Sequence, residues 1–171
     1  MTSVLIAFSA GTMAIIGRSV GAGDRERAKD TLMTSLGLSL VLGLLMTGLG
    51  LATMEPVAEL MGSGPETSQS LRDLAIVYME VVFWVAPLSF LASSAMVALQ
   101  ATGDTRSPMW ISAISGVLNL AISYLLIFGV MGLPELGVFG AAIGTAASFF
   151  LQALLVLWVL ARSDGMVGLF P

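Results

Sequence analysis

The chain has 171 residues, of which 57% are hydrophobic and 11% are charged, and it contains no cysteine and no histidine. This composition argues against an ordinary soluble domain and is typical of a protein that spans a membrane. Without cysteine or histidine there is no disulfide framework, no thiolate nucleophile and no usual zinc ligand, so we expect neither an enzyme nor a bound metal or organic cofactor. The net charge of −4 comes without the basic stripe that nucleic acid requires.

The charged residues are confined to the connections between long apolar stretches. Five stretches hold a single charge among them, that of Glu80, and each approaches the roughly 20 apolar residues that a helix needs to cross a bilayer. They lie at about residues 1–17, 31–54, 74–100, 109–133 and 136–161. The sequence therefore predicts an all-α fold, a polytopic membrane helical bundle with five transmembrane spans.

The connections contain residues that favour helix ends. Asp30 or Thr31 is the expected N-cap of the second span, and Ser107 that of the fourth. Residues 55–62 form a short amphipathic piece that predicts an interfacial helix rather than a span. Pro87 lies inside the third span, where it removes one backbone hydrogen bond and should bend the helix.

The basic residues lie almost entirely on one side of the predicted spans. Six of the seven Lys and Arg residues fall in the first connection, the third connection and the tail. Short connections rich in Lys and Arg stay in the cytoplasm. The predicted orientation therefore has the N-terminus outside and the C-terminus in the cytoplasm.

The first stretch is the shortest of the five. As a helix, its residues 1–17 reach about 25 Å, slightly less than the roughly 30 Å of a hydrocarbon core. We expect the chain to start inside a helix and to be part of a longer protein. A natural start that tolerates the mismatch is the alternative.

Small residues predict close helix packing, and intramembrane polar residues predict the sites of function. Gly140, Gly144 and Ser148 recur every four residues, a spacing that lets two membrane helices touch. Asn119 and Ser123 lie one turn apart on one helix face, where they either ligate a cation or proton or serve as polar contacts between helices.

Four further side chains are candidates for a cavity or substrate contact. Glu80 is either an interfacial carboxylate reached by water or a coupling or substrate group. Gln100 and Gln152 either satisfy a neighbouring helix or face a cavity. Trp84 either lines a pocket for flat lipophilic compounds or anchors its helix at the membrane interface.

Four segments, in order, resemble the multidrug and toxic compound extrusion (MATE) family of secondary transporters. They are GRSVGAGDRERA at 17–28, LQATGDTRSPM at 99–109, Asn119 followed by YLLIFG at 124–129, and PELGVFGAAIGTAAS at 134–148. Members of this family have twelve helices in two lobes. The resemblance therefore implies that residues 1–171 form a single partial lobe, helices two to six, whose partners are a missing helix one, a second lobe and the lipid bilayer.

The resemblance also implies a function. It indicates an antiporter of the plasma (inner) membrane, coupled to H+ or Na+, that exports lipophilic or cationic drugs by alternating access. The alternatives are a lipid-linked sugar flippase of the same superfamily and a non-transporting fragment or structural subunit. In the family, an acid on helix one joins an Asn and, one turn later, an Asp on helix five. Asn119 matches the Asn, but Ser123 stands at the Asp position and cannot titrate.

Overall fold

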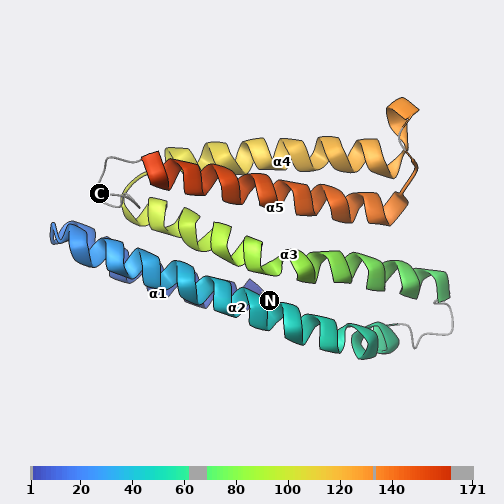
Figure 1. Ribbon diagram of the computed structural model, residues 1–171, viewed down its shortest axis with the longest axis horizontal. Coiled ribbons are helices and arrows are strands. Elements are labelled where there is room, and N and C mark those ends of the chain that lie inside the picture. Colours follow the sequence, from blue (N-terminus) through green and yellow to red (C-terminus); the bar gives the residue numbers. More distant parts are fainter. Residues whose placement is uncertain (1, 62–68, 133, 163–171) are drawn as a thin grey trace.

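The computed structural model describes residues 2–61, 69–132 and 134–162, and for residues 2–8, 60–61, 69–71 and 131 it describes the backbone alone. Within these ranges the fold is all-α and contains no strand, as predicted. The elements, in chain order, are α1 (Thr2–Gly21), α2 (Arg25–Met61), α3 (Gln69–Ala101), α4 (Arg106–Ile127), a short 3-10 helix η1 (Val130–Gly132) and α5 (Gly137–Arg162). Each α-helix runs antiparallel to the one before it (Figure 1).

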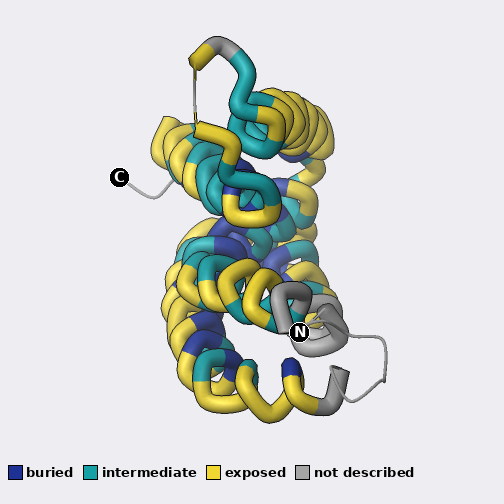
Figure 2. The backbone as a smooth tube through the Cα atoms, turned by 90° about the vertical axis from the view of Figure 1, so that its right-hand side faces the viewer, coloured by how far each residue is buried: buried dark blue, intermediate teal, exposed yellow. Residues whose placement is uncertain are grey.

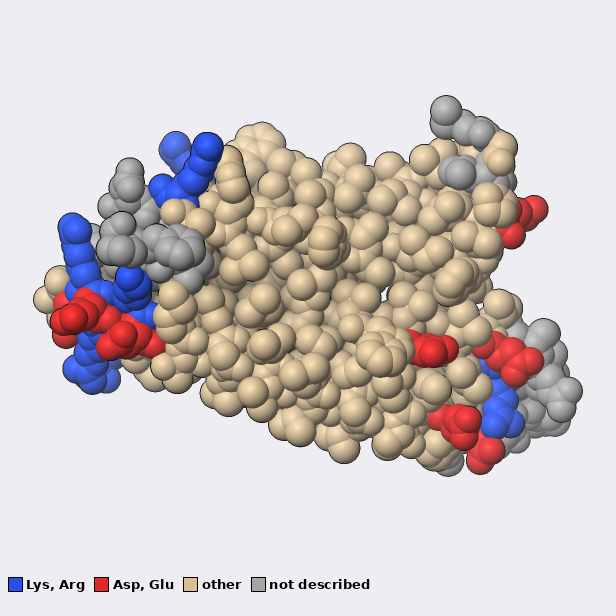
Figure 3. All heavy atoms as spheres, in the orientation of Figure 1, with Lys and Arg blue, Asp and Glu red and all other residues tan. Residues whose placement is uncertain are grey.

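Four of the five helices, α2 to α5, are long and apolar enough to cross a membrane, as judged on the described residues. α1 is not among these four, and the first eight residues of the predicted first span lie outside those whose side chains are described. A broad band without charged side chains separates two charged ends, and Lys and Arg gather at one of them (Figure 3). We call this the basic end. The described part of the chain thus has the charge distribution of a membrane-spanning bundle.

Several helix ends differ from the predicted limits: α1 ends at Gly21, and α2 and α3 begin at Arg25 and Gln69, each a turn or more outside the predicted span. Residues 55–61, predicted as a separate interfacial helix, are instead the last turns of α2, which runs through Pro56. Pro56 cannot donate to the carbonyl of Ala52, and both residues are exposed, near the end of the helix. α4 ends at Ile127, well before the predicted residue 133, because Gly129 and Gly132 adopt positive φ angles of 61° and 83°.

Two corners at the basic end share one backbone design. At each, a glycine with positive φ, Gly23 at 73° and Gly103 at 92°, ends a helix, and the aspartate that follows donates its amide N–H to the carbonyl five residues before it. The same aspartate then accepts from the first turn of the next helix: Asp24 Oδ1 accepts from the Arg27 amide at 3.0 Å, and Asp104 Oδ1 accepts from the Ser107 amide at 3.0 Å. The N-caps predicted at Asp30 or Thr31 and at Ser107 were therefore wrong, since each aspartate lies nearer the corner.

α3 occupies the centre of the bundle. It contacts α1 and α2 on one side and α4 and α5 on the other, and within the described residues neither α1 nor α2 contacts α4 or α5. Figures 1 and 2 show the resulting order, with exposed residues along the outer faces of the two pairs and buried residues where α3 meets them. Ala86, Ala95 and Ala98 are fully buried on α3, and such small residues let several helices approach a central one.

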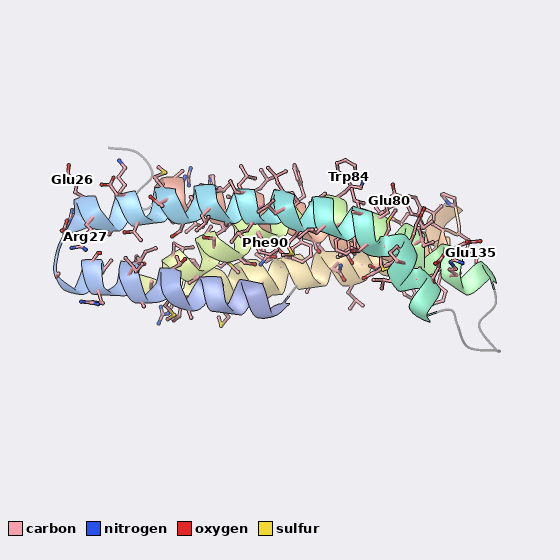
Figure 4. All side chains as sticks on the ribbon, turned by 90° about the horizontal axis from the view of Figure 1, so that it is seen from below. Glu26, Arg27, Glu80, Trp84, Phe90 and Glu135 are labelled. Carbon is pink, nitrogen blue, oxygen red and sulfur yellow. The ribbon has the colours of Figure 1, made fainter. Side chains whose placement is uncertain are left out.

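The largest buried cluster lies towards the basic end. Its members come from the last turns of α1, α3 and α5 and the first turns of α2 and α4, and they include Ile16, Leu32, Leu36, Met96, Leu99, Ile111, Val156 and Leu160. Phe90, which is 1% exposed, lies in the middle of the bundle (Figure 4). Beyond Phe90, towards the other end, most described residues of α3 are half-buried or exposed. The bundle is therefore packed most tightly at its basic end.

Candidate functional site

The crossing of α4 and α5 depends on two glycines. A Cβ atom on Gly140 would lie 2.8 Å from the main-chain carbonyl carbon of Leu126. On Gly144 it would lie 3.0 Å from the Ser123 amide nitrogen and 3.2 Å from the Asn119 carbonyl oxygen, and it would overlap the Ser123 hydroxyl. The predicted contact through Gly140 and Gly144 therefore exists, and it brings Asn119 and Ser123 against α5.

Asn119 makes the polar contact of this crossing. Its Nδ2 lies 3.4 Å from Thr145 Oγ1 and 3.3 Å from Ser148 Oγ, both on α5. The two hydroxyls donate their protons to α5 carbonyls, Thr145 to Ala141 at 3.0 Å and Ser148 to Thr145 at 2.7 Å. Their lone pairs are therefore left to accept both amide hydrogens of Asn119.

This arrangement leaves one atom of Asn119 without a role in packing. The amide hydrogens are taken, and among the described residues no donor lies within hydrogen-bonding distance of Oδ1. Asn119 is half-buried, so this oxygen is neither sealed in the bundle nor fully in solvent. A neutral carbonyl oxygen held in a fixed orientation can bind a cation or accept a hydrogen bond from a protonated acid.

Ser115, Asn119 and Ser123 form a polar stripe along α4, with one oxygen-bearing side chain per turn. Ser123 is half-buried and lies against Gly144. Ser115 is 4% exposed, and its hydroxyl oxygen is buried with no hydrogen-bond partner among the described residues. The spacing of four residues in the sequence was a signal for Ser115 that the sequence analysis did not use.

The other candidates are not brought to Asn119. Glu80 is exposed on α3, and Trp84 is 64% exposed with its ring directed away from the bundle (Figure 4). Gln100 is exposed near the end of α3. Gln152 is half-buried and lies one turn beyond Ser148 on α5, and no hydrogen bond joins it to Asn119. No group of three acidic residues that could hold a metal ion occurs among the described residues.

A small void adjoins the Asn119 contact on the far side of α5. It has a volume of about 120 Å³ and lies between α3 and α5, with Val82, Val85, Ser89, Thr145 and Phe149 among its walls. Thr145 thus has the Asn119 amide on one side and an apolar space on the other. The sequence analysis missed Thr145, although the residue directly follows Gly144.

Two adjoining hollows lie between α1 and α2 near the basic end. One has a volume of about 550 Å³ and the other about 420 Å³, and Arg27 borders both. Thr12, Thr34 and Ser35 line the first and Arg18 lines the second. Figure 4 shows Arg27 between the two helices, and no ion pair to Arg18 or Arg27 forms among the described residues. Asp30 also lines the first hollow and Asp24 the second, so carboxylates lie beside the two guanidinium groups.

A bundle of long apolar helices, with charge at its two ends and a half-buried polar contact between two spans, is typical of a multi-pass membrane protein. The family model MatE matches residues 1–125, which is most of the chain. The chain therefore belongs to the MATE family.

Relatives and solved structures agree with this assignment. A probable multidrug resistance protein YoeA from Bacillus subtilis (strain 168) is 30% identical over 162 residues, covering 95% of this chain and 34% of the relative. A FAD transporter from Shewanella oneidensis is 35% identical over 151 residues, covering 87% of this chain and 32% of the relative. An inward-facing multidrug resistance MATE family transporter has a TM-score of 0.83 at 28% identity, over 96% of this chain and 37% of that one. The chain thus spans about a third of the length of these relatives.

Proposed function

We propose that the chain forms most of one lobe of a cation-coupled antiporter that exports lipophilic or cationic small molecules by alternating access. Family membership and the likeness to a multidrug resistance transporter support this function. Because the relatives are about three times as long, a further helix and a second lobe complete the transporter in this proposal.

The proposed transport is tested in proteoliposomes that contain the complete transporter. A gradient of protons or of sodium ions should drive efflux of an ethidium-type dye, and dissipating that gradient should stop it. Dye flux with no dependence on either gradient would contradict coupling. Absence of any flux would favour a non-transporting subunit.

We propose a topology of five spans in the plasma membrane, with the N-terminus outside and the basic end in the cytoplasm. The positive-inside rule supports this orientation. The exposed Trp110 and Trp158 beside Arg106 support only the placement of this end at a membrane interface, because tryptophan is favoured at both interfaces. The chain has no native cysteine, so single cysteines report sidedness directly. An impermeant maleimide added to intact cells should label Glu135→Cys and spare Thr105→Cys, and the reverse pattern would invert the topology.

We propose Asn119 and Ser123 as this lobe's part of the cation or proton site. The observation behind it is the Asn119 Oδ1 atom, which has no partner among the described residues. Because Ser123 cannot titrate, the acid of such a site has to come from another helix. Gradient-driven flux should fall in Asn119→Ala and Ser123→Ala, and unchanged coupling in both would assign the pair to helix packing.

A second candidate substrate class is a phosphate-bearing dinucleotide. The FAD transporter at 35% identity suggests it. Guanidinium groups bind phosphate in two-pronged geometry, and Arg18 and Arg27 border one hollow, which the Asp24 carboxylate also lines. In this case Arg27→Gln should weaken FAD uptake while leaving ethidium flux unchanged. Arg25→Gln, on an exposed residue that does not line the hollows, is the matched control.

A further inference from the structure

The backbone hydrogen bonding of α3 is interrupted at Pro87, and a residue of α2 supplies the missing donor. Proline has no N–H, so the carbonyl of Phe83, four residues earlier, loses its partner within the helix. Thr47 of α2 donates its hydroxyl to this carbonyl, with Oγ1 2.7 Å from Phe83 O. Thr47 is 8% exposed, so this hydrogen bond replaces one that water cannot easily supply.

Two glycines on the same face of α2 allow this contact. A Cβ on Gly43 would overlap Pro87, lying 3.1 Å from its nitrogen and 3.3 Å from the Ala86 carbonyl oxygen. A Cβ on Gly50 would overlap the Phe83 ring. Gly43, Thr47 and Gly50 are four and three residues apart and so share one helix face. This face of α2 therefore packs against the Pro87 region of α3 over two helical turns.

On the side facing α5, the Pro87 region of α3 borders the void between α3 and α5. Val82 and Val85 precede Pro87 and Ser89 follows it, and all three line the void. The facing wall includes Thr145, the residue that accepts from Asn119. The direction in which α3 bends at Pro87 therefore determines how much space lies beside the Asn119 contact.

We propose that Thr47 is a positioning residue, which holds the bend of α3 through the Phe83 carbonyl and so keeps the void beside Thr145 open. A hydroxyl has one proton to donate, and the Gly43 carbonyl of Thr47's own helix lies 3.0 Å from Oγ1 as a second acceptor. If the N-terminal part of α3 moves towards α5, Thr47 turns to Gly43 and no donor is orphaned. The movement then costs the hydrogen bond to the Phe83 carbonyl, which is left without a donor. The void gives the N-terminal part of α3 space to move into.

The test measures the position of the N-terminal part of α3 relative to α5 and does not depend on transport. Because the chain lacks native cysteine, spin labels can be placed on Asp73→Cys and Val138→Cys alone. Both positions are exposed, near the starts of α3 and α5. Pulsed electron–electron resonance on the full chain in lipid nanodiscs then gives the distribution of distances between the labels.

Thr47→Val preserves the shape of the side chain but removes the hydroxyl, so the population at shorter distances should rise about threefold, the factor that corresponds to about 0.6 kcal/mol for one hydrogen bond between membrane helices. Thr47→Ser keeps the hydroxyl and should restore the parent distribution. In a Pro87→Ala background the new amide of residue 87 donates to the Phe83 carbonyl. Thr47→Val should then leave the distance distribution unchanged.

Two results would overturn the proposal. One is a Thr47→Val variant that elutes as a monodisperse protein and has an unchanged distribution of distances between the labels. The other is an equal shift for Thr47→Val with and without Pro87, which would assign the effect to packing of the side chain. If Thr47→Val does not yield monodisperse protein, Thr47→Ala compared with Thr47→Ser decides in the same way, since only the serine retains the hydroxyl.

Discussion

The α2–α3 contact and the α4–α5 contact use glycine in the same way but serve different polar groups. Gly43 admits the Pro87 turn of α3, and Gly144 admits the backbone of α4. At α2–α3, the group that needs a partner is a main-chain carbonyl, and one hydroxyl satisfies it. At α4–α5, the group is the Asn119 side chain, and two hydroxyls satisfy only its amide hydrogens.

This difference separates a structural polar contact from one with chemical capacity. The Thr47 bond completes a helix in which proline leaves an acceptor unpaired, so the one proton of the Thr47 hydroxyl is used within the fold. The Asn119 contact leaves an acceptor, Oδ1, unused. A buried polar residue therefore points to function when some of its atoms are not used in packing, and the following substitutions test this distinction.

The largest effect is expected at the α4–α5 crossing. Gly144→Val should lower the free energy of unfolding by about 3 kcal/mol, because its side chain would meet the main chain of Ser123 and Asn119, which cannot move aside easily. SDS titration of the protein in mild detergent measures this change. Gly116→Val is the control, since nothing lies within 4 Å of a Cβ at Gly116. Equal effects of the two substitutions would show that the crossing does not depend on close approach.

A smaller effect is expected at the α2–α3 contact. Gly43→Ala should cost about 2 kcal/mol of unfolding free energy because the new methyl group would press on Pro87. At Gly48, with open space around its Cβ position, the same change should be neutral or stabilise α2 by up to about 1 kcal/mol. Chemical denaturation of the pair in one detergent compares them. A Gly43→Ala variant as stable as Gly48→Ala would mean that the two helices can separate freely at this point.

The two corners at the basic end should make similar contributions, because each aspartate accepts from the first turn of the next helix. Asp24→Ala and Asp104→Ala should each lower the unfolding free energy by about 1 kcal/mol through loss of the carboxylate that accepts from these amides. A difference of more than about twofold between the two would indicate that the corners are not equivalent.

The Asp104 corner should also respond to pH. Hydrogen bonds from Ser107 hold the pKa of the Asp104 carboxyl below its ordinary value. Since the folded-state pKa is lowered, the stabilisation is complete above the ordinary aspartate pKa and is lost as the pH falls through the lowered value. Asp104→Asn keeps a capping side chain and should remove this part of the pH dependence. Unfolding curves of the parent and of Asp104→Asn, recorded between neutral and strongly acidic pH, measure this difference in pH dependence.

The smallest effect on stability is expected at Asn119. Asn119→Ala should cost only about 0.6 kcal/mol, because Thr145 and Ser148 keep their own carbonyl acceptors and the glycines maintain the crossing. The same SDS titration measures it. A loss above about 2 kcal/mol would make Asn119 chiefly a structural residue and weaken the case for a cation site.

Much of the fold could be predicted from residue patterns. The all-α class, the carbonyl that Pro87 leaves without a helical partner and the small-residue contact through Gly140 and Gly144 all follow from local chemistry. The helix ends were predicted less well. α2 continues through Pro56, although a proline inside a helix leaves one carbonyl without its partner. The roles of Asp24 and Asp104 were missed because each aspartate both follows the glycine that ends one helix and accepts from the first turn of the next.

The site could be predicted only in part. Asn119 and Ser123 are polar residues in an apolar span and so stand out in the sequence, but nothing local to them indicates Thr145 or Ser148 as partners. That pairing depends on which turn of α5 faces which turn of α4. Glu80 and Trp84, equally prominent in the sequence, lie on the outside of the bundle instead.

The sequence by itself determined that this protein is a bundle of membrane helices with one basic end, because hydropathy and the placement of charge act over single helices and short connections. It also contained the motifs of the MATE family. The tertiary structure alone decided which polar groups satisfy one another: Thr47 pairs with the carbonyl that Pro87 frees, and Asn119 keeps an unpaired oxygen. Those pairings join residues 26 to 36 positions apart, so they depend on helix register and crossing, which no local pattern specifies.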